Sequence, residues 1–228
     1  MADYRCEAST LEGFIQQLAV AYLAHGYYFY ICGSVPEGKD PKKVDAKLMG
    51  KYGVGISKHA RYRRKALGQA SVQYLRFDRF FVLLATHGQH QFFSPQDEGG
   101  EGDRIRDARR TPIRYAGYSV SARRRTGDGT KLVVHVQIDQ KTYLEMRDTL
   151  VDLASKRTAQ WLEHQFKNLP FEAYAPVRRQ VVTMFRKVND ARKAAGLEEV
   201  SESCLKLRRY PTRPFAAGHG AKQDRASV

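Results

Sequence analysis

Strict alternation between residues 132 and 138 is the feature that most constrains the fold of this chain. Every second residue of this segment is apolar, and His135 lies among the residues between them. A period of two predicts a β-strand with one buried face and one half-polar face. Residues 113–123 alternate in the same way, and Thr-Gly-Asp-Gly at 126–129 predicts a turn between the two strands. We therefore expect an antiparallel hairpin.

Earlier segments of the chain also predict strands. Residues 27–34 are aromatic or apolar at both parities, which is typical of a central strand that is covered on both sides. Residues 72–75 and 80–86 predict another hairpin, with a turn near Asp78. We expect about five strands in a mostly antiparallel sheet.

Helical periodicity surrounds these strands. Residues 10–24 repeat apolar side chains at helical spacing, with a capping box that begins at Ser9 and with Gly26 as the end of the helix. A second helix is expected from Pro41. The chain after residue 139 is mostly helical in pattern, which predicts an α+β fold with a helical C-terminal region. The order of the first elements resembles a ferredoxin-like or split βαβ arrangement.

The sequence predicts three regions. Residues 1–155 are expected to form the α+β sheet domain, and residues 156–210 a basic helical C-terminal subdomain. From about residue 211 the chain has Gly, Ala and charged residues without periodicity, so residues 211–228 are expected to be a disordered tail.

Positive charge is the strongest functional signal. Lys and Arg number 39 against 24 Asp and Glu, which gives a formal net charge of +15 and a pI near 9.8. A protein this basic usually has a polyanionic partner, and nucleic acid is the commonest one. One alternative is that the protein is basic only to remain soluble. Another is a non-catalytic assembly protein whose basic surface docks an acidic protein.

The positive charges form three clusters. The first lies in a short segment with a helical pattern, the second brackets the strand at 113–123, and the third recurs every seven residues along a helix that begins at Pro176. Arg predominates in the second cluster, and its planar guanidinium suits phosphate oxygens and base stacking. The candidate nucleic-acid contacts are Lys58, Arg61, Arg64 and Lys65, then Arg109, Arg110, Arg114, Arg123, Arg124 and Arg125, and finally Arg179, Arg186 and Lys193.

Two tyrosines accompany the second cluster. Tyr115 and Tyr118 share a predicted strand with Arg114, and arginines interleaved with aromatic side chains are what a single-strand stacking surface needs. The alternative is that these tyrosines face the core and only the arginines lie outside. The basic helix favours DNA slightly over RNA, because such a helix can lie along or in a groove of a duplex. We therefore expect a nucleic-acid-binding protein.

The cysteines and the N-terminus indicate a compartment. Cys6, Cys32 and Cys204 are scattered, odd in number and outside any C-x-x-C motif, which fits a reducing environment. The N-terminus lacks the apolar stretch of a signal peptide, and no apolar run approaches membrane-spanning length. We expect a cytoplasmic protein without membrane contact. The sequence has no nucleotide-binding motif, and no cofactor is expected.

A group of histidines supports an enzymatic alternative. His87 and His90 follow the strand at 80–86, and His135 lies on another strand. Histidines near a sheet end can hold a divalent metal, and Tyr143 on the next helix could then attack a phosphodiester covalently.

This constellation resembles that of the HUH endonucleases, the relaxase, Rep and tyrosine-transposase nucleases that nick single-stranded DNA. The resemblance covers roughly residues 27–153 by element order, and it implies a metal-dependent nicking enzyme of a replication or mobile-element system. In that family one bulky apolar residue separates the two histidines, whereas Gly88 and Gln89 separate them here. If this alternative does not hold, the histidines form hydrogen bonds in a loop or at a sheet edge.

Overall fold

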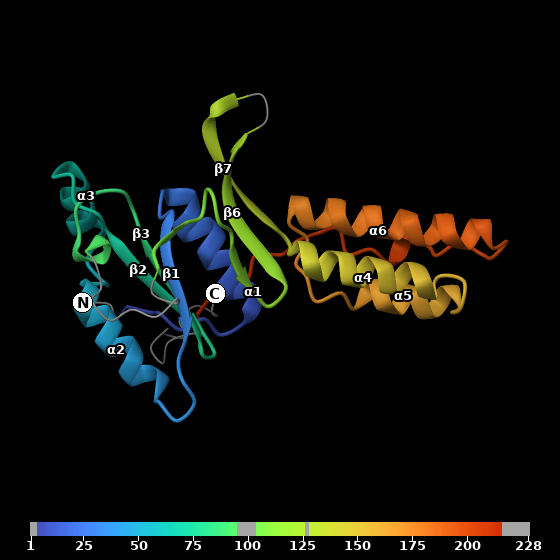
Figure 1. Ribbon diagram of the computed structural model, residues 1–228, viewed down its shortest axis with the longest axis horizontal. Helices are drawn as coiled ribbons and strands as arrows, with labels where there is room; N and C mark the ends of the chain where they lie inside the picture. The colour runs from blue at the N-terminus through green and yellow to red at the C-terminus, as the bar shows by residue number, and fades with distance from the viewer. Residues whose placement is uncertain (1–3, 95–103, 126–127, 216–228) are drawn as a thin grey trace, which may run out of the picture. The chain divides into compact units, whose positions relative to one another are not determined.

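The computed structural model describes residues 4–94, 104–125 and 128–215 (Figure 1). In this described part the fold is α+β, as the sequence predicts, with six α-helices and two antiparallel sheets. The chain divides into two compact units, Met1–Asp107 with Pro211–Val228, and Ala108–Tyr210. The boundary that we expected after residue 155 falls inside the second unit. None of the described helices has the length and apolarity that crossing a membrane requires.

The first unit contains a four-stranded sheet in the order β2-β3-β1-β4. Its strands are β1 (Phe29–Ser34), β2 (Val72–Phe77), β3 (Phe80–Ala85) and β4 (Arg106–Asp107). β3 pairs antiparallel with both β1 and β2. β1 and β2 therefore run parallel with an antiparallel strand between them. Because the chain passes from β1 to β2 through helices, this is the split βαβ unit that the sequence predicts.

The first helix begins at a different residue from the one that the capping-box pattern predicts. Thr10, not Ser9, is the N-cap of α1 (Leu11–Gln16), and its hydroxyl accepts a backbone N–H of the first turn at 3.1 Å. The chain continues through a π-helical segment and a 3₁₀ turn to His25. Gly26 ends the helix, as predicted, because its φ of 91° is a conformation that glycine adopts without strain.

Two helices connect β1 with β2. α2 (Pro41–Tyr52) begins after its N-cap Asp40 with proline at the first position, and Gly53 ends it with φ of 57°. α3 (Lys58–Ala66) is capped by Ser57, whose hydroxyl accepts a backbone N–H at 3.2 Å. α3 has no buried residue.

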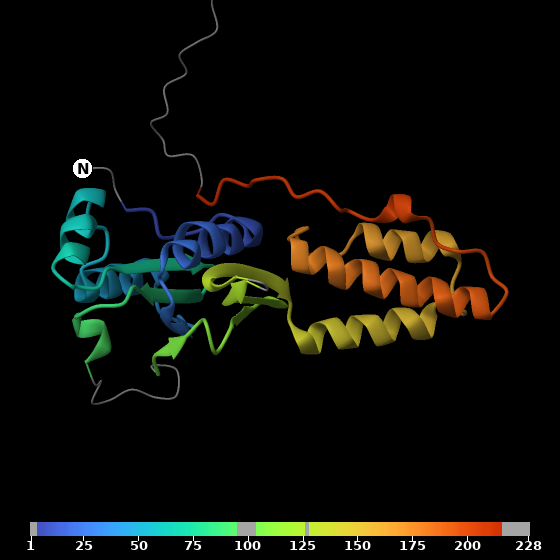
Figure 2. The same ribbon diagram turned by 90° about the horizontal axis from the view of Figure 1, so that it is seen from above.

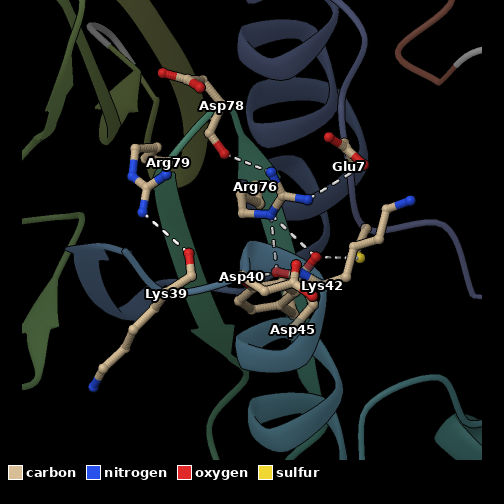
Figure 3. A network of polar contacts seen from close by, with 10 residues as sticks. Glu7, Lys39, Asp40, Lys42, Asp45, Arg76, Asp78 and Arg79 are labelled. Atoms are coloured by element: carbon tan, nitrogen blue, oxygen red, sulfur yellow. Dashed lines mark hydrogen bonds and ion pairs between the residues drawn. The ribbon is translucent and has the colours of Figure 1, made fainter. Parts of the chain in front are cut away.

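A buried ion pair joins α2 to β2 (Figure 3). Arg76 donates from Nε to both carboxylate oxygens of Asp45, at 2.9 and 3.0 Å. The Tyr74 hydroxyl donates to the same carboxylate at 2.5 Å, and Glu7 lies 3.2 Å from Arg76. Asp45 and Arg76 are 4% and 2% exposed. Each of these charges therefore depends on the other for its stability in the interior.

The second unit contains a three-stranded sheet in the order β5-β6-β7. Its strands are β5 (Ile113–Tyr115), β6 (Tyr118–Arg125) and β7 (Asp128–Ile138). The prediction of one strand across β5 and β6 is wrong, because Ala116 and Gly117 have φ of 46° and 77°. Positive φ at both central residues makes a two-residue hairpin turn. The single sheet of about five strands that we expected is thus replaced by two sheets.

Three helices complete the second unit (Figure 2). They are α4 (Gln140–Leu153), α5 (Ala159–Lys167) and α6 (Ala175–Ala194). Their apolar faces form one core with the end of β7. In this core the rings of Phe166 and Phe185 lie 5.4 Å apart in an edge-to-face arrangement.

An extended segment follows α6 and runs back along it. The Asn189 side chain exchanges two hydrogen bonds with the backbone of Val200, at 3.0 and 2.8 Å. Arg178, one turn into α6, donates to the Leu207 carbonyl at 3.1 Å. The segment therefore contacts first the C-terminal half and then the N-terminal turn of the helix.

The first part of the expected disordered tail has an ordered position instead. Thr212 exchanges two hydrogen bonds with the side chain of Gln16, at 3.0 and 2.5 Å. The Pro214 carbonyl accepts from the Ser9 N–H at 2.9 Å. These bonds, to Ser9 before α1 and to Gln16 at the end of α1, attach residues 211–215 to the first unit. The rest of the tail lies outside the described residues.

Candidate nucleic-acid interface

β6 and β7 form a long hairpin in the second unit (Figure 1). Three arginines end β6. Arg123, Arg124 and Arg125 are all exposed. Arg123 is oriented by a hydrogen bond from its Nε to the Ser121 hydroxyl, at 3.3 Å. In the described part of the chain, none of the three forms an ion pair. Residues 126–127 of the predicted turn lie outside the described residues.

A paired hydrogen bond attaches α6 to the other end of this hairpin. Gln180 Oε1 accepts from the Ile138 N–H at 2.8 Å, and Gln180 Nε2 donates to the Ile138 carbonyl at 2.9 Å. This contact brings Arg179 near His135 on β7. The pKa of His135 is lowered by burial, and then by the positive charges of Arg123 and Arg179. One arginine from the second sequence cluster and one from the third therefore influence His135.

The third cluster forms a row along the outside of α6. Arg179, Arg186 and Lys193 are exposed, as the seven-residue repeat predicts. Two helical turns separate successive members, which is about 10 Å. Asp190 is also exposed on this side, but no described ion pair joins it to the row. The row and the arginines of the hairpin carry positive charge that the described side chains do not neutralise.

Other arginines of the second unit contact protein groups. Arg114, a predicted contact, forms an ion pair with Asp139 at 2.8 Å. Arg192 is buried and donates to the carbonyls of its own unit. The remaining two predicted contacts, Arg109 and Arg110, are exposed in the turn before β5.

The first cluster lies on α3 in the other unit. Lys58 and Lys65 are exposed, whereas Arg61 and Arg64 are half-buried. Arg61 donates to the Ile56 carbonyl at 2.6 Å. Arg64 lies near enough to His90 that burial and this positive charge together lower the pKa of His90. Only part of the predicted cluster therefore points to solvent.

The residues of the enzymatic alternative belong to different units. His87 and His90 are in the first unit, and His135 and Tyr143 are in the second. His90 Nδ1 accepts from the Phe92 N–H at 3.0 Å, so this histidine caps a short turn. Tyr143 packs against the helical core. Among the described residues, no group of three or more His, Cys, Asp or Glu could hold a metal ion.

The tyrosines of the second cluster do not form a stacking surface. Tyr118 is 1% exposed, and its hydroxyl accepts from the Glu172 N–H at 2.7 Å, so it is a core residue. Tyr115 is half-buried. An exposed aromatic residue next to basic side chains occurs instead on α3, where Tyr62 is 76% exposed.

No family model, curated protein or solved structure matches the chain. The candidate interface therefore depends on the positions and charges of the residues described above.

Proposed function

We propose that this protein binds nucleic acid, with DNA slightly favoured over RNA, through phosphate contacts of its exposed lysines and arginines. The main support is that Arg123 from the hairpin and Arg179 from α6 both place positive charge close enough to His135 to lower its pKa. Like charges that are held close together repel, and an anion between them relieves the repulsion. A phosphate group has the charge and the oxygen geometry for two guanidinium groups.

The distribution of charge supports the same proposal. Between Ala108 and Tyr210 the sequence has 21 Lys and Arg residues against 11 Asp and Glu residues. This unit therefore carries +10 of the net charge of +15. A surface of this sign attracts nucleic acid because each phosphate contact releases condensed counterions.

The slight preference for DNA follows from the shape of the basic elements. The major groove of B-DNA admits an α-helix or a two-stranded β-ribbon. The second unit carries exposed positive charge on one element of each kind, α6 and the β6–β7 hairpin. We also propose that the protein is cytoplasmic, as the sequence predicts.

Charge-removing variants test this proposal. We expect Arg179→Ala and Arg186→Ala to weaken binding to a labelled DNA duplex and to reduce the steepness of its salt dependence by about one for each phosphate that the variant no longer binds. Matched controls are Lys141→Ala and Lys156→Ala, which remove the same charge. Both lysines are exposed, and each forms an ion pair with an acidic residue of α4. Equal loss in all four variants would mean that net charge, and not this surface, decides binding.

The same binding assay separates the alternatives. Strand cleavage that requires a divalent metal and is lost in His87→Ala or His135→Ala would make the protein a nuclease. A stable complex with an acidic protein, without binding to nucleic acid, would make it an assembly protein. Either result would overturn the proposal.

A further inference from the structure

α3 carries an exposed aromatic side chain in the middle of a basic helix. Tyr62 is 76% exposed. Five of the nine residues of α3 are Lys or Arg, none is acidic, and none is buried. A helix without an apolar face gains almost nothing from packing, and like charges three and four residues apart destabilise it. The core therefore gives no reason for the position of this tyrosine.

Contacts at its two ends hold α3 in place. Ser57 caps the start, and Arg61 donates to the Ile56 carbonyl there. After the end, Gly68 accepts from the Gln89 N–H at 2.9 Å. The adjoining Gly88 is packed so closely that a Cβ would lie 2.6 Å from the Gly68 carbonyl oxygen. The ends are thus fixed to the protein, while the outer face of the helix is left to solvent.

Helical spacing places positive charge on the same outer face as the ring. Lys58 is four residues before Tyr62, and Lys65 is three residues after it. Such neighbours lie about 5–6 Å apart at Cβ. Both lysines are exposed, and in the described part of the chain neither forms an ion pair. The ring therefore has a free cation within one turn on either side.

This combination selects one class of ligand. An apolar protein surface would leave the two ammonium groups unpaired, and acidic side chains alone would leave the ring without a partner. A paired duplex shows its bases only at their edges, so their faces are closed to the ring. A single strand has both a flat base that can stack and flanking phosphates that can pair with lysine.

We propose that α3 binds an unpaired nucleotide, with the base stacked on Tyr62 and the flanking phosphates at Lys58 and Lys65. This inference rests on the proposed function and names a single-stranded segment as the ligand of the first unit. Because the ring, and not the phenolic hydroxyl, carries the contact, phenylalanine can replace the tyrosine.

The test compares three variants of the full chain, Tyr62→Ala, Tyr62→Phe and Leu67→Ala. The probes are a labelled single-stranded DNA oligonucleotide and the blunt duplex that it forms with its complement. We expect Tyr62→Ala to weaken single-strand binding about 5- to 100-fold and to leave duplex binding unchanged. Tyr62→Phe should bind as the wild type does. Leu67 follows the last residue of α3 and is 73% exposed, so it is the control for the loss of exposed apolar surface. Leu67→Ala should bind normally.

Three results would overturn this inference alone. They are unchanged single-strand binding in Tyr62→Ala, an equal loss for the duplex, and a loss in Tyr62→Phe as large as in Tyr62→Ala. Absence of binding to either probe by the wild type would overturn the proposed function together with the inference. Circular dichroism of each variant checks that the exposed substitutions leave the fold intact.

Discussion

Arg192 lies inside the second unit, although its neighbour Lys193 on α6 is exposed. Its Nη1 donates to the carbonyls of Ala154 and Arg157, at 2.7 and 2.8 Å, and its Nε donates to the carbonyl of Glu198. One guanidinium thus joins the turn after α4 to the turn after α6. This arginine stabilises the helical bundle, whereas the exposed cations Arg179, Arg186 and Lys193 on the same helix are those that we propose contact phosphates.

Replacing this residue should therefore destabilise the protein. We expect Arg192→Ala to lower the free energy of unfolding by about 3 kcal/mol, because three carbonyls lose a charged donor in the interior. Arg192→Lys should recover only part of this loss, since one ammonium group cannot reproduce the planar geometry. Urea unfolding followed by circular dichroism measures the difference. Lys193→Ala is the control, and a loss as large in that variant would show that burial of Arg192 is not the cause.

His135 provides a pH-dependent signal at the proposed interface. Burial and the charges of Arg123 and Arg179 lower its pKa below the usual 6.5. The folded protein therefore keeps this histidine neutral at pH values where the unfolded chain protonates it. The stability that comes from this difference is fully present above pH 6.5 and is lost as the pH falls below it.

We expect the NMR-measured pKa of His135 to rise in Arg179→Ala and again when nucleic acid is bound. The variant removes the positive charge of Arg179, which repels protonated His135. In the wild type, a bound phosphate would neutralise the same charge. His135→Gln should also flatten the fall in stability below pH 6.5. An unchanged pKa in Arg179→Ala would show that this arginine does not influence the histidine.

At the scale of elements, the helices and strands with local signals were predictable. α2 starts at Pro41 as expected, and Asp40 and Gly53 flank it, because these residues favour a helix start and end by their own chemistry. The turn at Ala116 and Gly117 was missed because alanine rarely adopts positive φ, and the alternation continues across it. Its position depends on tertiary packing, since Gly117 lies against Phe171 from a distant part of the same unit.

The candidate site was predictable only in part. The repeat along α6 gave the exposed row correctly, since helical spacing alone decides which residues share a face. The position of Arg179 near His135 depends on the contact of Gln180 with Ile138, which no local pattern identifies. The exposure of Tyr62 has a sequence signal, because no apolar residue larger than alanine lies three or four positions away from it. An aromatic residue with such neighbours cannot belong to the apolar stripe of a helix.

The two basic helices should differ in local stability. α6 buries six residues, among them Met184 and Phe185, whereas α3 buries none. We expect the backbone amides of α3 to exchange with deuterium much faster than those of α6, because opening α3 exposes little apolar surface. A single-stranded oligonucleotide should slow exchange in α3. Slow exchange in free α3 would mean that the contacts at its ends are enough to stabilise the whole helix.

At the scale of the whole molecule, positive charge is unequally divided between two units that each have their own sheet. In the second unit, the β6–β7 hairpin and α6, which are far apart in the sequence, both carry exposed positive charge. If the net charge served solubility alone, binding to polyanions would not depend on which lysines and arginines carry the charge. In the binding mode that we propose, specified residues contact phosphates, while other arginines such as Arg76 and Arg192 serve the fold.

The most direct test of phosphate binding is the salt dependence of affinity for a labelled DNA duplex, measured by fluorescence anisotropy on the wild type. If Arg123, Arg179, Arg186 and Lys193 each contact one phosphate, a plot of log affinity against log salt should have a slope of about −3.6. A slope near zero, or no binding at low salt, would contradict the central claim that this basic surface binds nucleic acid.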